Sequence, residues 1–150
     1  MAQIARQIET LENADVMAIL FRDADGTASS GRGEWTAKHQ SMLTGFAAEN
    51  FDQGIPMLPK PISEAWLLCA VQQRYQHCDQ LECASGKNAS PESMKKRLAS
   101  LLGGKATQTV LVDAVQDGLI DMRQISMPSL TAFKENADHV LDKLGFPTGL

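Results

Sequence analysis

The chain has 150 residues, of which 43% are apolar, and its formal net charge at pH 7 is −4. This length and composition predict one globular domain, residues 1–150, with a core of its own. The acidic balance excludes a protein that binds nucleic acid or acidic membranes through its overall charge. The sequence contains no apolar run near the roughly 20 residues of a membrane-spanning helix and no signal-peptide pattern. We therefore expect a cytoplasmic protein with no membrane partner.

The first elements in the chain are a helix and a strand. Ile4, Ile8 and Leu11 recur at helical spacing, which predicts an amphipathic helix over residues 2–13. The continuous apolar run of residues 16–21 predicts an interior strand of a parallel sheet, covered on both faces.

The middle of the chain predicts a loop, a second helix and a proline-rich strand. Residues 26–33 are rich in glycine and serine, which is typical of a loop. Residues 36–51 have helical apolar spacing. Residues 55–62, "IPMLPKPI", contain three prolines, which cannot donate to a sheet ladder. We expect this extended piece to be a short or edge strand.

Helices dominate the remainder of the chain. Ser63 is expected to cap a helix that begins at Glu64 and runs to about residue 82. Further helices are predicted from Ser90-Pro91-Glu92 to Gly103-Gly104, over residues 108–122, and over residues 127–145. The order of elements predicts the α/β class, with a small, mainly parallel sheet in residues 1–88 and a helical extension in residues 89–150.

Three cysteines, Cys69, Cys78 and Cys83, have a spacing that matches no zinc motif. His77 beside Cys78 leaves a metal cluster open as an alternative. In a reducing cytoplasm we expect all three to be free thiols, buried as small apolar side chains.

Acidic residues follow both predicted strands. Asp23 and Asp25 come directly after the first strand, and Glu64 follows the second extended piece. Ligands of α/β sheets bind at the carboxyl ends of the strands, and side chains at i and i+2 of an extended segment leave the same side. If the strands are neighbours, the three acids converge and can hold one hard cation such as Mg²⁺ for phosphoryl transfer. Solvated turn carboxylates, a calcium loop and, for Glu64, simple stabilisation of a helix N-terminus remain open.

Basic residues cluster at Lys95, Lys96 and Arg97. Consecutive positions fan around a helix and cannot form one stripe. The cluster is either a solvated face or a patch that binds phosphate groups of a nucleic acid. His39 and His77 have no acid at a convincing spacing, and we expect them to be structural or exposed.

Four segments taken in order resemble one protein family: "LFRDADGT", "PKPISEAWLLCA", "SPESMKKRL" and "MPSLTAFKENADHVL". They are similar to the small prokaryotic Toprim-like proteins of initially unknown function, which are related to the catalytic domain of OLD-family nucleases. The resemblance implies the topoisomerase–primase fold, here lacking its first strand. In that fold an Asp-x-Asp motif and neighbouring acids hold Mg²⁺ or Mn²⁺ for phosphodiester cleavage or transfer. Asp23 and Asp25 match the motif, and Glu64 matches the glutamate of the "EAWLL" segment.

The resemblance implies a metal-dependent phosphodiesterase or nuclease component, of a bacterial antiviral defence or mobile-element system. Asp23, Asp25 and Glu64 would be its catalytic and metal-binding residues, and a nucleic acid would be its substrate. The basic cluster would contact that nucleic acid.

One feature departs from the family. Toprim domains carry another glutamate at the end of an earlier strand, whereas here a helix alone precedes the Asp-x-Asp strand; Glu34 is an unsupported substitute. The alternative function is therefore a non-catalytic subunit that binds a larger ATPase or nuclease partner. Met94, Met122 and Met127 are candidates for its partner surface. With either function we expect a protein partner or a homo-oligomer. Hydrolysis of small phosphate compounds is a third alternative.

Overall fold

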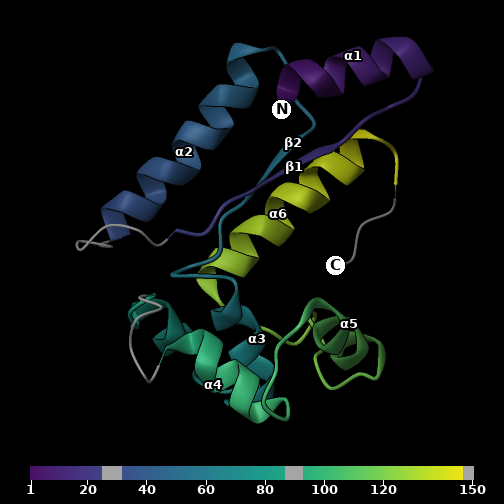
Figure 1. Cartoon of the computed structure of the whole chain (residues 1–150). Helices are drawn as coiled ribbons and strands as arrows, with labels where there is room; N and C mark the ends of the chain where they lie inside the picture. The colour runs from purple at the N-terminus through teal and green to yellow at the C-terminus, as the bar shows by residue number, and fades with distance from the viewer. Residues whose placement is uncertain (25–31, 87–92, 147–150) are drawn as a thin grey trace. The chain divides into compact units, whose positions relative to one another are not determined.

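The computed structural model describes residues 1–24, 32–86 and 93–146. In chain order the elements are α1 (Ala2–Glu12), β1 (Ala18–Phe21), α2 (Arg32–Ala48), β2 (Gly54–Met57), α3 (Glu64–Val71), the 3₁₀ helix η1 (Cys78–Cys83), α4 (Met94–Leu101), α5 (Gln108–Gln116) and α6 (Pro128–Lys143) (Figure 1). Parallel strands combined with helices confirm the α/β class. None of the helices in these ranges is long and apolar enough to cross a membrane.

The elements form two compact units. The sheet unit contains α1, β1, α2, β2 and α6 from Thr131 onward. The helical unit contains Asp23 and Ala24, and then α3, η1, α4 and α5. The last helix of the chain thus belongs with the strands rather than with α4 and α5.

Within the described residues the sheet has two parallel strands, paired in a register that runs from Ala18↔Gly54 to Phe21↔Met57. The N–H of Ala18 donates to Gln53 O, and alternate residues of each strand therefore bond to the other strand. By this alternation the nitrogen of Pro56 faces away from β1, which is how β2 accommodates a proline. The expectation of a short edge strand is confirmed.

One face of the sheet is covered by the first two helices. Ala18 of β1 packs with Ala2 and Ala5 of α1 and with Phe46 of α2. The N-terminal end of α1 lies beside the C-terminal end of α2 (Figure 1). This layer buries only the β1 side chains that point toward α1 and α2.

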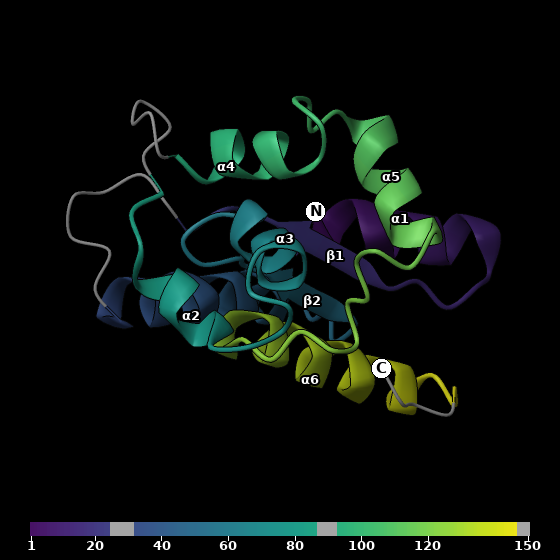
Figure 2. The ribbon, with the colours of Figure 1, turned by 90° about the horizontal axis from the view of Figure 1, so that it is seen from below.

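The other face is covered only in part. Ile55 of β2 is fully buried against Ala137 and Val140 of α6, and Figure 2 shows α6 alongside β2. Ile19 and Phe21 of β1 share this face but are 42% and 51% exposed. The prediction that β1 is an interior strand covered on both faces is therefore wrong. The physical reason is that α6 lies over β2, and β1 has no second strand neighbour among the described residues.

The first helix forms nearly as predicted, but it packs through a different face. Its buried residues are Ala2 and Ala5, whereas Ile4, Ile8 and Leu11 are 60%, 42% and 80% exposed. Small alanine side chains let the helix approach the sheet closely, so the apolar stripe that predicted the buried face lies on the surface.

A close contact joins α2 to β2. The ring of Phe46 lies so near the Cα of Gly54 that a Cβ at this glycine would overlap it. The absence of a side chain at Gly54 thus allows the end of α2 to pack closely against the start of β2. α2 begins at Arg32, earlier than the predicted residue 36, and ends at Ala48.

α3 begins at Glu64 as predicted but ends at Val71 rather than near residue 82. Arg74, Tyr75 and His77 have φ values of 47°, 64° and 53°. A left-handed backbone cannot continue a right-handed helix, so the chain turns here before η1 begins.

The cysteines are not all free, which corrects the expectation of three buried thiols. Cys69 of α3 and Cys78 of η1 form a disulfide that closes this turn. Cys83 is free, and it is exposed rather than buried.

The later helices end where glycines take a left-handed backbone. α4 stops before Gly103 and Gly104, as predicted, and α5 stops before Gly118, earlier than the predicted residue 122. The predicted helix start at Ser90-Pro91-Glu92 lies outside the described residues.

Candidate functional site

Asp23 follows β1, and its carboxylate reaches the first turn of α3. The backbone N–H of Ser63 donates to Asp23 Oδ1 at 2.8 Å. Ser63 itself has a helical backbone and makes no side-chain capping bond, so the prediction that its hydroxyl caps α3 is wrong. Asp23 supplies both the acceptor and the negative charge that a helix N-terminus favours.

Glu64 is the first residue of α3, and its side chain is only 17% exposed. Its Oε2 accepts from Ser63 Oγ at 3.5 Å, and its Oε1 lies 3.8 Å from the Lys95 ammonium nitrogen. Asp23 and Glu64 therefore both contact Ser63. Three positions far apart in the sequence, 23, 64 and 95, gather around one helix N-terminus.

The second acid of the predicted motif, Asp25, lies outside the described residues, as does the side chain of Glu34. Among the residues that are described, no group of three or more His, Cys, Asp or Glu side chains is placed to hold a metal ion. Mg²⁺ in proteins is usually held by one or two carboxylates with water completing the shell. The donor chemistry of Asp23 and Glu64 fits that cation.

The three basic residues of α4 diverge. Lys95 faces Glu64, and Arg97 Nη2 donates to Gln72 Oε1 at 2.7 Å. Lys96 is exposed. The divergence is the geometry expected of consecutive helix positions, and it leaves Lys95 as the member nearest the two carboxylates.

A buried polar cluster elsewhere in the helical unit was not anticipated from the sequence. Glu82 is buried, and its Oε1 accepts from the Ser129 N–H at 2.7 Å. Ser129 Oγ accepts in turn from Trp66 Nε1 at 2.8 Å. These contacts fix η1 and α3 to the first residues of α6. Each hydrogen bond joins residues more than 45 positions apart, so no local sequence pattern predicts it.

The histidines are structural or exposed, as expected. The His39 ring stacks on Trp35 with centroids 5.0 Å apart, and burial lowers the pKa of His39. Trp35 Nε1 donates to Leu58 O at 2.8 Å, which anchors the pair. His77 is exposed at the start of η1.

The methionines do not form the partner surface that the sequence suggested. Met94 and Met127 are almost completely buried, and Met122 packs against the core of the helical unit. They fill the interior of the protein, which is the commoner role of methionine.

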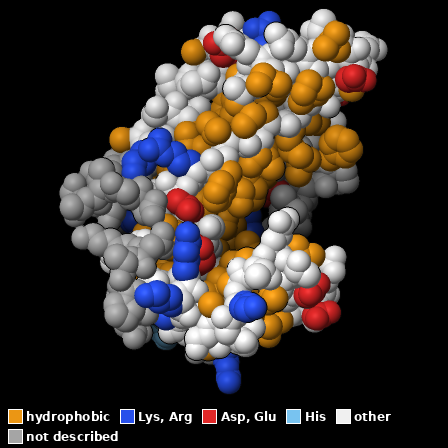
Figure 3. All heavy atoms as spheres, viewed as in Figure 1, with side chains coloured by type: hydrophobic (Ala, Val, Ile, Leu, Met, Phe, Trp, Pro, Cys, Tyr) orange, Lys and Arg blue, Asp and Glu red, His pale blue; other side chains and the backbone are white. Residues whose placement is uncertain are grey.

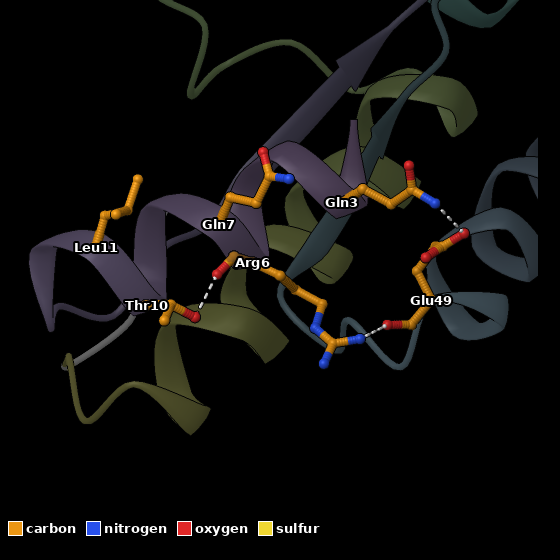
Figure 4. Close-up of a pocket in the computed structure, with 6 residues that line it drawn as sticks. All are labelled: Gln3, Arg6, Gln7, Thr10, Leu11 and Glu49. Atoms are coloured by element: carbon orange, nitrogen blue, oxygen red, sulfur yellow. Dashed lines mark hydrogen bonds between the residues drawn. The ribbon is translucent and has the colours of Figure 1, made fainter.

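Two surface hollows offer weaker chemistry. One, of about 530 Å³, lies along α1, and its polar groups already bond one another: Gln3 and Arg6 both donate to Glu49 (Figure 4). The other, of about 620 Å³, is lined mainly by Leu67 and by apolar residues of α5. Neither gathers carboxylates as the N-terminus of α3 does.

Comparison with protein-family models, curated proteins and solved structures finds no match to this chain. The Toprim resemblance therefore stays a prediction from sequence.

Proposed function

We propose that the chain is a metal-dependent, Toprim-like phosphodiesterase that acts in the cytoplasm as the nuclease component of a bacterial defence or mobile-element system. The observation that supports this proposal is the meeting of Asp23 and Glu64 at Ser63. Two acids from separate parts of the chain flank one helix N-terminus, with Lys95 beside them. Carboxylates next to a basic group are the side chains that a metal-assisted phosphoryl transfer uses.

In this proposal Asp23, Asp25 and Glu64 hold Mg²⁺ or Mn²⁺. Held there, the cation would stabilise charge on the phosphate and lower the pKa of an attacking water. The Ser63 N–H donates to Asp23 Oδ1 and thereby orients the carboxylate. Lys95 neutralises a phosphate oxygen, and Lys96 and Arg97 contact the neighbouring nucleic-acid backbone.

The test is calorimetric titration of Mg²⁺ and Mn²⁺ into the purified chain. Binding should be lost in Asp23→Asn/Asp25→Asn and weakened in Glu64→Gln, because each change removes anionic ligands while keeping side-chain shape. Asp79→Asn is the matched control, since Asp79 is exposed on η1 of the same unit. Equal affinity in wild type and the double variant would contradict the metal site.

Cleavage is tested separately, with single- and double-stranded DNA and RNA in the presence of Mg²⁺ or Mn²⁺. Activity should disappear in Asp23→Asn, whose thermal stability should stay close to that of the wild type because the asparagine oxygen still accepts from the Ser63 N–H. Full activity in that variant would contradict the assignment of Asp23.

A second function, a non-catalytic subunit for a larger ATPase or nuclease, is favoured by the half-exposed Ile19 and Phe21 on β1. A subunit of this kind would cleave no nucleic acid in the presence of Mg²⁺ or Mn²⁺. Stable co-purification with a partner, together with absent Mg²⁺-dependent activity of the purified chain, would select this function over the nuclease.

A further inference from the structure

The two edges of the sheet differ in their capacity to accept another strand. The backbone N–H and C=O groups of Ala18 face β2. These groups alternate between the two sides of an extended segment, so those of Met17, Ile19 and Phe21 face the opposite edge. Within the described residues no strand lies there. On β2 the corresponding outer edge carries Pro56, which has no N–H to donate.

The strand at this open edge carries exposed apolar side chains. Met17, Ile19 and Phe21 are 45%, 42% and 51% exposed, and residues 16–21 contain no charged side chain. Figure 3 shows hydrophobic side chains gathered in a band over the part of the view where Figure 1 labels β1 and α6. Exposed edge strands usually carry a charge, a proline or a bulge that blocks pairing, and β1 has none within residues 16–21.

We propose that this edge binds β1 of a second copy of the chain, antiparallel and about a twofold axis at Ile19. In this register Ile19 lies opposite its own counterpart, and Met17 lies opposite Phe21. All the outward N–H and C=O groups of these three residues are then paired across the axis. The sheet becomes a continuous four-stranded one with Pro56 on both outer edges.

The side chains favour the same partner. The pairing sets Ile19 against Ile19 and the Met17 thioether against the Phe21 ring, a contact that sulfur and aromatic groups favour. No charged side chain lies within residues 16–21, whereas the next pair of this register, Asp15 opposite Asp23, joins like charges and weakens the pairing.

The surface area that the two copies would bury predicts how strongly they pair. Side chains stand roughly perpendicular to a sheet, so strand pairing covers only the flanks of Met17, Ile19 and Phe21. The buried area is therefore well below the roughly 1,200 Å² typical of stable complexes. The dimer should form at high protein concentration and dissociate on dilution. This inference is independent of cation binding, which concerns the helical unit.

Sedimentation velocity over micromolar to millimolar concentrations of the purified chain tests the proposal. The apparent mass should rise from one chain, 16.3 kDa, toward twice that value. Ile19→Lys sets two charges against each other on the axis and should keep the chain monomeric throughout. Val112→Lys is the matched control, because Val112 on α5 is similarly exposed at 45% and should leave the dimer intact.

Amide hydrogen exchange of the wild-type chain locates the interface. The Ile19 and Phe21 amides should gain protection as concentration rises, whereas the Ala18 amide, bonded to Gln53 O, should be protected at every concentration. A wild-type chain that stays monomeric would overturn the proposal and point to a strand of another protein as the occupant. A dimer that Ile19→Lys leaves unchanged, or one without protection at Ile19 and Phe21, would also overturn it.

Discussion

The Asp23 carboxylate accepts a 2.8 Å hydrogen bond from the Ser63 N–H, forty positions away, and thereby occupies the N-terminus of α3. Asp23 thus has a structural task whether or not a cation binds. Any experiment that removes its side chain changes the helix start and the candidate site together. Substitutions at this position must therefore separate the loss of the acceptor from the loss of the charge.

Asp23→Ala should lower the free energy of unfolding by about 1 kcal/mol, the usual effect of removing a helix-capping acceptor. Asp23→Asn keeps an oxygen that accepts from the Ser63 N–H, so its free energy of unfolding should fall by clearly less. Urea denaturation of both variants in a metal-free buffer measures the difference. If both variants unfold like wild type, the Asp23–Ser63 bond contributes nothing to the stability of the chain.

Gly54→Ala should lower the free energy of unfolding by about 1–3 kcal/mol, because the added methyl overlaps the Phe46 ring and forces a shift of α2 or β2. Gly45→Ala is the control on α2. Nothing lies within 4 Å of a Cβ at Gly45, and alanine at a helix interior is favoured over glycine by roughly 0.5–1 kcal/mol. Thermal denaturation should move the two variants in opposite directions, and equal shifts would refute the contact.

Reduction of the Cys69–Cys78 disulfide should lower the free energy of unfolding by about 2–3 kcal/mol, the chain-entropy value for a loop of this length. Cys69→Ala/Cys78→Ala should match the reduced chain and be insensitive to reductant. Denatured without reductant, the wild type should titrate one thiol, that of Cys83. Three reactive thiols in such a sample would mean that the bond had not formed.

The same cysteines test the proposed cytoplasmic location. Disulfides persist in oxidising compartments and are rare in the reducing cytoplasm. Cys69 and Cys78 are buried, so cells should be quenched with acid and the thiols alkylated under denaturing conditions. Both cysteines should then be modified if the chain resides in the cytoplasm and the pair is reduced there. A pair that is alkylated under denaturing conditions only after a reductant is added would contradict the cytoplasmic proposal.

The stability of the chain should depend on pH through His39. Burial lowers the folded-state pKa of His39 below its ordinary value near 6.5. Below that pH the unfolded chain binds a proton that the folded chain does not, so His39 should reduce stability as the pH falls from about 6.5 toward the folded pKa. His39→Phe keeps a ring on Trp35 and should flatten this part of the profile. Denaturation midpoints between pH 7.5 and about 5 measure it, and an unchanged slope in the variant would exclude His39 as the cause.

Local patterns predicted the beginnings and ends of several elements. The start of α3 at Glu64 and the end of α4 before Gly103 depend on neighbouring residues, which a sequence displays. The short edge strand was predictable because prolines restrict hydrogen bonding wherever they occur. The parallel pairing followed from apolar runs joined by a helix.

What the sequence could not show depends on distant partners. The stripe of Ile4, Ile8 and Leu11 predicted a buried face, but the alanines of α1 fit the sheet more closely. The end of α3 depends on a left-handed turn at non-glycine residues, for which no residue type is diagnostic.

The candidate site was predicted in part. The sequence identified Asp23 and Glu64 as acids that follow strands, and the structure brings both to Ser63. It gave no indication that Asp23 rather than the Ser63 hydroxyl would cap α3, because that contact joins positions forty residues apart. Lys95 was known as one of a basic group, and its place beside Glu64 follows from the packing of α4 on α3.

Pro56 hinders the addition of another strand to the outer edge of β2. A β-sheet protein with two open edges can add copies without limit and form fibrils. Here Pro56 leaves the outer edge of β2 without a backbone N–H donor at its centre. Once two copies have paired through β1, the edges that remain exposed are the two β2 edges that carry Pro56. Self-assembly by strand pairing then stops at a closed pair, and replacing Pro56 by a β-forming residue such as valine would open a route to polymerisation.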